Sequence, residues 1–145
     1  MKNIRTTAQL AFRVFVRPLF PVLQSVVFAL GLDRNPKERE AFLLGRLKDG
    51  VSLAQAREHL LRHGFFDNPV AYTDPGQVLS LRRLSDEHPD HQYHIRIFND
   101  GEVRGHYEFT PEDKPWKHLH NVGLEAQREK YIPWVQDILT IEGHA

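Results

Sequence analysis

The chain contains no cysteine among its 145 residues. This absence excludes disulfides, thiol nucleophiles, thiolate zinc sites and iron–sulfur clusters. Also missing are an N-x-Ser/Thr acceptor, a phosphate-binding glycine loop, a G-x-S-x-G elbow and an HExxH pattern. No motif therefore specifies a reaction. A chain without cysteine suits a reducing compartment, so we expect a cytoplasmic protein, either free or held at a membrane surface.

Acidic residues are absent from one part of the chain. The 19 basic and 19 acidic residues cancel, which argues against a protein that coats nucleic acid through bulk charge. Residues 1–32, however, carry four basic residues and no acid, so this segment has a charge of +4. The apolar content of 41% and the length suit one globular domain. We therefore expect a separate N-terminal segment, 1–32, followed by a single domain, 33–145.

The most apolar stretch is too short to cross a membrane. A spanning helix needs about 20 apolar residues, whereas the charge-free run, residues 18–32, has 15 and includes two prolines. Residues 10–32 could instead lie on a membrane surface or on a protein partner, with arginines beside an apolar face. A kinked helix packed on its own domain and a targeting peptide are the two alternatives.

The middle of the chain predicts an αα-hairpin. Asn35 and Pro36 begin a helix over 36–48, which Asp49-Gly50 ends. Ser52 and Gln55 form a capping box for a second helix over 52–63. Further on, residues 77–84 are interpreted as a strand rather than a helix. A final helix is expected over 123–140, with Leu124, Tyr131, Trp134, Val135 and Ile138 as its buried stripe.

Residues 93–109 predict a β-hairpin with one apolar and one polar face, because apolar and polar residues alternate along both halves. The tip, residues 99–101, is Asn-Asp-Gly. A three-residue loop with a glycine bulge keeps each set of side chains on one face, whereas a two-residue loop would mix them. The expected register pairs Ile97 with Val103, Tyr93 with Tyr107 and His94 with His106.

The polar face of this hairpin holds the candidate catalytic residues. His94, His106 and Glu108 could transfer protons, and Arg96 or Arg104 could bind a phosphate or carboxylate ligand. Directly opposed side chains in a sheet have Cβ atoms about 5 Å apart, which would bring these groups together. The alternative is a solvated sheet face with ordinary cross-strand pairs.

Histidines also predict a candidate metal site. No cofactor is required by any motif, but two or three imidazoles and a carboxylate would suit a divalent, zinc-like ion. The carboxylate could come from Glu108 or Asp113. The candidate histidine ligands are His94, His106, His118 and His120.

A winged helix is the nucleic-acid alternative. It would use helices at 36–48, 52–63 and 75–84, with the hairpin as its wing. The segment 75–84 carries only Arg82 and Arg83 as basic residues and has acids on both sides, so we do not expect a nucleic-acid partner.

The expected fold is α+β: the N-terminal segment, an αα-hairpin, a three-stranded antiparallel meander and a C-terminal helix on its apolar face. The first functional hypothesis is a non-enzymatic binding or adaptor protein that associates with a membrane or partner through residues 10–32. The second is a small hydrolase, acting on phosphodiesters or assisted by metal, that uses the polar hairpin face.

Overall fold

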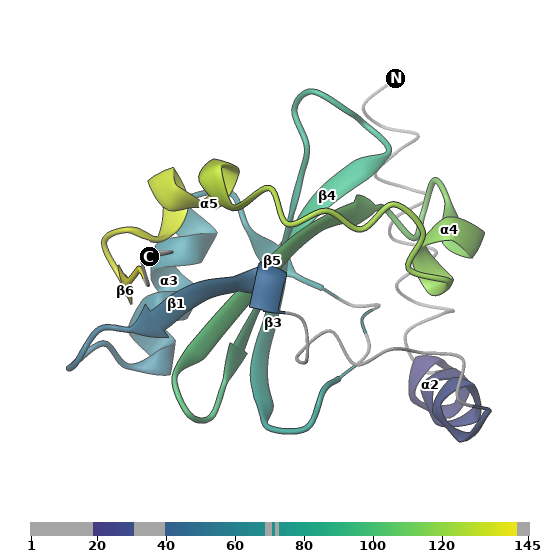
Figure 1. Ribbon diagram of the computed structural model, residues 1–145, viewed down its shortest axis with the longest axis horizontal. Coiled ribbons are helices and arrows are strands. Elements are labelled where there is room, and N and C mark those ends of the chain that lie inside the picture. Colours follow the sequence, from purple (N-terminus) through teal and green to yellow (C-terminus); the bar gives the residue numbers. More distant parts are fainter. Residues whose placement is uncertain (1–18, 31–39, 69–70, 72, 142–145) are drawn as a thin grey trace.

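The computed structural model describes residues 19–30, 40–68, 71 and 73–141 (Figure 1). The mixed α+β class is confirmed. In chain order the elements are α2 (Phe20–Ala29), the 3-10 turn η2 (Glu40–Phe42), β1 (Leu43–Leu47), α3 (Leu53–Arg62), β2 (Phe66–Asp67), β3 (Gln77–Leu84), β4 (His91–Phe98), β5 (Glu102–Phe109), α4 (Pro115–Leu119), α5 (Arg128–Val135) and β6 (Leu139–Thr140).

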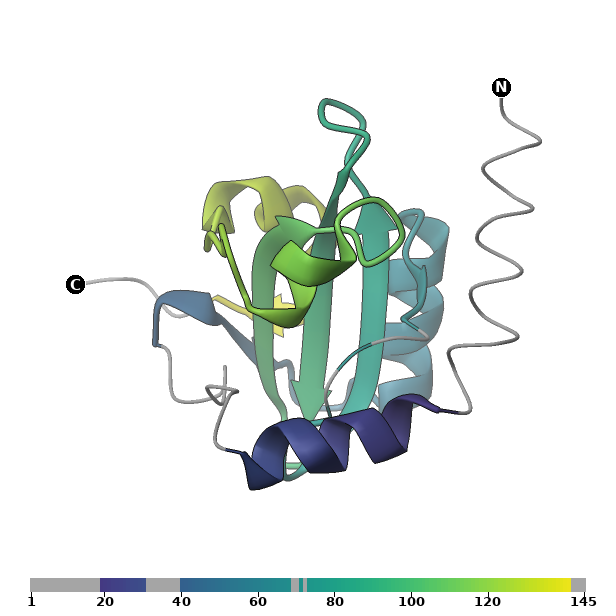
Figure 2. The same ribbon diagram turned by 90° about the vertical axis from the view of Figure 1, so that its right-hand side faces the viewer.

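The described strands form one antiparallel sheet in the order β2-β3-β4-β5-β1-β6. The three expected strands, β3 to β5, are adjacent in it, but the sheet is twice as wide as a three-stranded meander. Helices α3 and α5 cover one face (Figure 1). Helices α4 and α2 lie on the other side, toward opposite ends of the strands (Figure 2). The sheet is therefore flanked on both sides.

The hydrophobic core lies between the sheet and helices α3 and α5. Its strand residues include Ile95 and Ile97, which are 0% and 1% exposed, as expected for the apolar face of the hairpin. Ala56 and Leu60 of α3 pack into the same cluster. From the C-terminal end, α5 and the residues after it add Tyr131, Val135, Ile138 and Leu139.

Gly105 allows α5 to approach the sheet closely. A Cβ atom at this position would lie 2.8 Å from Leu44 Cδ1 and 2.8 Å from two ring atoms of Tyr131, closer than real Cβ contacts come. The Tyr131 hydroxyl consequently reaches the sheet backbone, 2.7 Å from the carbonyl oxygen of His106 and 3.0 Å from that of His94. The core side chain Tyr131 thus contacts the backbone of two site residues.

The predicted αα-hairpin is wrong. Of the helix expected over 36–48, residues 36–39 lie outside the described part, and Leu43–Leu47 form strand β1 between β5 and β6. Gly45 interrupts the register with β5 and has a φ of 152°. A Cβ there would lie 2.2 Å from the carbonyl oxygen of Thr140, so the glycine permits β6 to pair with β1. Asn35 and Pro36 favour a helix here, but a short apolar run such as AFLLGRL is equally compatible with a buried strand.

The second expected helix matches α3, including the capping box between Ser52 and Gln55. The C-terminal helix is shorter than expected at both ends. Helix α5 runs from Arg128 to Val135, so Leu124 and Ile138 of the expected stripe lie outside it, and the chain continues into β6. Of the N-terminal segment 1–32, residues 1–18 and 31–32 lie outside the described part, and Phe20–Ala29 form α2. Within the described residues, no helix combines the length and apolarity needed to cross a bilayer.

Candidate functional site

Strands β4 and β5 bring the candidate histidines together. The Cα partners along this hairpin include Ile97 with Val103, Tyr93 with Tyr107 and His94 with His106, the pairs that a three-residue loop implies. Because side chains alternate along a strand, Glu108 lies two residues beyond His106 on the same face. Gln92 is its partner on β4.

The polar face is buried, so the expectation of a solvated sheet face is wrong. His94 is 1% exposed, His106 is 3% and Glu108 is 4%. The ring of Phe42, from η2, lies 5.3 Å from the His106 ring, measured between centroids. Thr110, just after β5, is also buried. Tertiary elements that the strand pattern does not reveal thus remove this face from water.

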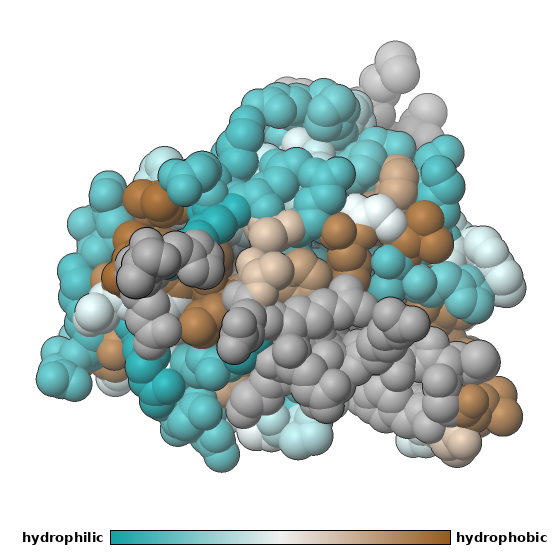
Figure 3. Space-filling model, viewed as in Figure 1, coloured by the Kyte–Doolittle hydropathy of each residue, from teal (hydrophilic) through white to brown (hydrophobic). Residues whose placement is uncertain are grey.

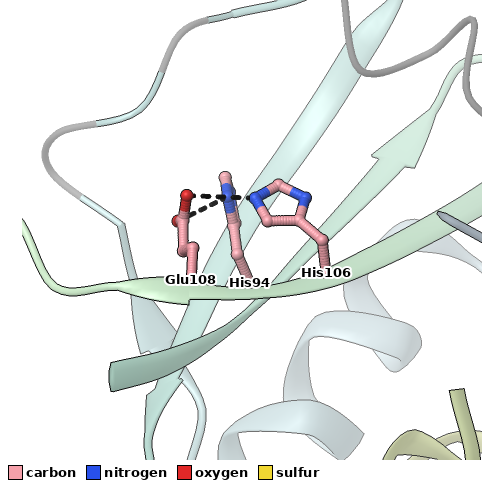
Figure 4. A group of neighbouring side chains, drawn as sticks. All are labelled: His94, His106 and Glu108. Carbon is pink, nitrogen blue, oxygen red and sulfur yellow. Dashed lines mark ion pairs between the residues drawn. The ribbon is translucent and has the colours of Figure 1, made fainter. Parts of the chain in front are cut away.

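Two imidazoles converge on one carboxylate (Figure 4). The Nδ1 atom of His94 lies 3.3 Å from Oε1 of Glu108, and Nε2 of His106 lies 3.2 Å from Oε2. The two rings meet edge to face with centroids 4.9 Å apart. The potential metal-binding atoms of the three residues all lie within 4.8 Å of one another.

Neighbouring polar side chains orient this group. The hydroxyl Oγ of Ser80, on β3, lies 2.8 Å from Nε2 of His94. The Gln92 amide donates to Oε1 of Glu108 over 2.7 Å, while its oxygen accepts from Arg82 at 3.0 Å. The residues joined by these hydrogen bonds all lie on strands β3 to β5, which limits the movement of their side chains.

The buried arginines pair with carboxylates outside the cluster. Arg82 donates to Glu112 on the segment between β5 and α4, with one bond of 2.8 Å. Arg96 lies 3.3 Å from Asp74. Glu108, by contrast, is surrounded by an amide and imidazoles.

Burial determines the charges of the cluster. It is the main cause that lowers the pKa of His94 from 6.5 to about 3, and the Arg96 guanidinium adds to the effect. Burial likewise lowers the pKa of His106. Burial alone would raise the pKa of Glu108, but the imidazoles of His118 and His106 hold it well below 4.5. At neutral pH the cluster is therefore one carboxylate between neutral imidazoles.

The other predicted residues divide into two groups. His118, on α4, approaches the cluster, with Nδ1 3.4 Å from Oε2 of Glu108 and 2.9 Å from the carbonyl oxygen of Phe109. His120 does not, since it is exposed and its ring packs against that of Trp116, with centroids 4.0 Å apart and the planes tilted by 58°. Asp113 is also exposed and accepts a hydrogen bond from Thr110. Arg104, predicted to bind a ligand with Arg96, forms an ion pair with Glu102.

Sequence reasoning did not identify Ser80, Gln92, Arg82 and Glu112 as parts of the site. A signal for two of them was present, because Ser80 and Arg82 are the β3 partners of Arg96 and His94 and share their face. Pairing residues 77–84 with the hairpin would have found them. Glu112 reaches the face from a connection, where no periodicity locates a side chain.

The winged-helix interpretation is wrong. Residues 43–47 and 77–84, which it needed as helices, are strands, and β4–β5 lies inside the sheet rather than projecting as a wing. No protein-family model, curated protein or solved structure matches the chain. The inference of function therefore depends on the site itself.

Proposed function

We propose that the protein binds one divalent transition-metal ion of the zinc class through His94, His106 and Glu108. The observation that carries this proposal is the spacing of the three groups. Zinc bonds to imidazole nitrogen and carboxylate oxygen are about 2.0–2.1 Å long, so neighbouring ligands in a tetrahedral site are about 3.3 Å apart. Oε1 of Glu108 lies 3.3 Å from His94 Nδ1 and Oε2 lies 3.2 Å from His106 Nε2, close to this spacing, and the candidate ligand atoms of all three residues lie within 4.8 Å of one another.

The contacts around the ligands support the same proposal. A metal-binding histidine usually donates its second ring N–H to an oxygen, which fixes the tautomer and points the other nitrogen at the ion. The Ser80 hydroxyl is placed to accept from Nε2 of His94, leaving Nδ1 free to bind. Gln92 holds the Glu108 carboxylate in a similar way. Neutral imidazoles and an ionised carboxylate are the forms that bind metal.

The burial of the site supports a binding protein rather than an enzyme. All three ligands are at most 4% exposed, and two of them are opposed residues of a central hairpin. A substrate would need a path to the ion that these exposures do not provide. The function favoured by the geometry is thus the non-enzymatic one: a domain that holds a metal ion inside a rigid sheet.

Metal affinity in solution tests the proposal. Zinc titrated into chelator-stripped protein should bind with a stoichiometry of one, and Mg²⁺ should not compete, because nitrogen ligands favour zinc. His106→Gln and Glu108→Gln should each weaken binding by at least about 100-fold, roughly the loss of one ligand bond. His120→Gln, which alters an exposed imidazole outside the site, is the matched control and should bind as the unmodified protein does. The proposal would be refuted if zinc bound weakly and if His120→Gln reduced the affinity as much as His106→Gln does.

A metal-assisted hydrolase is the second candidate, favoured by the number of ligands. Catalytic zinc sites have three protein ligands and one position for water, whereas structural sites use four protein ligands. The Nδ1 atom of His118 is engaged with the Phe109 carbonyl oxygen, so it does not offer itself as a fourth ligand. A zinc ion bound in such a site lowers the pKa of a bound water toward neutrality.

An activity measurement separates the two candidates. The hydrolase would be established if zinc-loaded protein cleaves a simple phosphodiester such as bis(p-nitrophenyl) phosphate. The activity should then be abolished in Glu108→Gln and retained in His120→Gln. Tight binding of zinc without turnover of phosphodiester or carboxylic ester substrates would leave the binding protein as the function.

A further inference from the structure

Helix α2 presents an exposed stripe of large apolar side chains. The stripe consists of five residues between Leu19 and Leu30. At 100° of rotation per residue, they fall on one side of the helix, within an arc of about 100°. Backbone bonds from Leu23 to Leu19 and from Leu30 to Val26 extend the helical path over the whole stripe. Its members and their exposures are Leu19 at 68%, Val22 at 66%, Leu23 at 43%, Val26 at 50% and Leu30 at 65%.

The stripe lies at the margin of the molecule. Figure 1 places α2 away from the hydrophobic core and beside the sheet, and Figure 3 shows hydrophobic side chains at that edge. Scattered single apolar residues are normal on a protein surface, but a contiguous row marks a surface for association. A partner for this row would have to be apolar where it meets the helix.

The sequence around the stripe identifies the kind of partner. Residues 1–32 contain Lys2, Arg5, Arg13 and Arg17 and no acidic residue. An apolar helix face joined to basic residues matches a bilayer with anionic headgroups, where each basic residue near the surface adds attraction. A partner protein with an apolar groove would explain the stripe but not the complete lack of acids.

We propose that α2 lies flat on the surface of an anionic phospholipid membrane, with the stripe in the interface between headgroups and acyl chains. A helix of ten residues is about 15 Å long, which suits an orientation parallel to the surface. This proposal is independent of the metal site, because α2 contributes none of the three proposed ligands.

Vesicle flotation with the full chain tests the proposal. The protein should float with vesicles of phosphatidylcholine and phosphatidylglycerol and much less with phosphatidylcholine alone. Raising the salt concentration should reduce flotation, because salt screens the attraction between the basic residues and the lipid. Leu23→Glu and Val26→Glu should each weaken binding at least about tenfold, the effect of removing one large apolar side chain from a lipid environment.

The matched control is Leu53→Glu. Leu53 is 38% exposed at the first position of α3, where an acidic residue is compatible with the helix. This variant should float as the unmodified protein does, and circular dichroism should show that all variants fold. Equal binding to neutral and anionic vesicles would contradict the proposed preference for an anionic membrane. Absence of flotation would contradict membrane binding. A dimer in light scattering that Val26→Glu dissociates would show that the stripe binds a second copy of the protein instead.

Discussion

The hydroxyl of Tyr131 lies 2.7 Å from the carbonyl oxygen of His106, across the sheet from the His106 side chain. One residue of α5 therefore links the hydrophobic core to the backbone that carries the proposed ligands. The contact depends on Gly105, where any side chain would displace the Tyr131 ring.

Tyr131→Phe should lower the free energy of unfolding by about 1–2 kcal/mol, since it removes a buried donor and leaves a carbonyl without it. Urea denaturation followed by circular dichroism measures the change. The variant should still bind zinc, because the ring of Phe keeps the packing of α5. An unchanged unfolding midpoint would mean that the hydroxyl contributes nothing to the sheet.

Ile95→Ala should lower the free energy of unfolding by about 2–5 kcal/mol, because Ile95 is 0% exposed in the core and truncation leaves a cavity. Val78, on β3, is 47% exposed and provides the control. Val78→Ala should change stability by no more than about 0.5 kcal/mol. Similar losses in the two variants would contradict the assignment of the apolar face to the core.

Acid should destabilise the metal-free protein, beginning below pH 6.5. The pKa of His94 falls to about 3 on folding, so between these values the unfolded chain binds a proton that the native protein excludes. Each pH unit in that window then removes about 1.4 kcal/mol of stability for this one group. His106 acts in the same direction, and Glu108, with its lowered pKa, adds to the loss below pH 4.5.

Urea denaturation between pH 7.5 and pH 4.5, in the presence of a chelator, measures this dependence. In His94→Gln, the slope of the free energy of unfolding against pH should decrease by the amount that corresponds to about one proton, because glutamine does not titrate. A free energy of unfolding that is constant from pH 7 to pH 5 would contradict the burial of neutral imidazoles.

Ser80→Ala should weaken zinc binding by about 10–100-fold, the usual effect of removing a group that orients a ligand. The reason is that Nε2 of His94 loses its 2.8 Å partner and the ring can rotate away from Glu108. Ser52→Ala is the control, since it removes a helix cap and destabilises the fold by about 1 kcal/mol at a distance from the site. Isothermal titration that shows equal affinity for Ser80→Ala and the unmodified protein would remove Ser80 from the site.

The hairpin was predictable because two local signals agree. Alternation of period two assigns the faces, and the Asn-Asp-Gly tip fixes the register that brings His94 opposite His106. The helix α3 was predictable for a similar reason, since the capping box between Ser52 and Gln55 marks its start.

Strand β1 and the burial of the polar face were not predictable from such signals. The run from Leu43 to Leu47 pairs with β5 and β6, which come much later in the chain, and the missing side chain of Gly45 leaves room for β6. The polar residues of the hairpin alternate like those of a solvated strand. Whether Phe42 and the segment after β5 cover them depends on tertiary packing, which the alternation does not encode.

X-ray absorption at the zinc K edge, on protein loaded with one equivalent of zinc, tests the central claim most directly. The account predicts four-coordinate zinc with bonds of about 2.0–2.1 Å and the outer-shell scattering of two imidazoles, reduced to one in His106→Gln. A six-coordinate ion surrounded by oxygen, or imidazole scattering that His106→Gln leaves unchanged, would contradict a metal site at His94, His106 and Glu108.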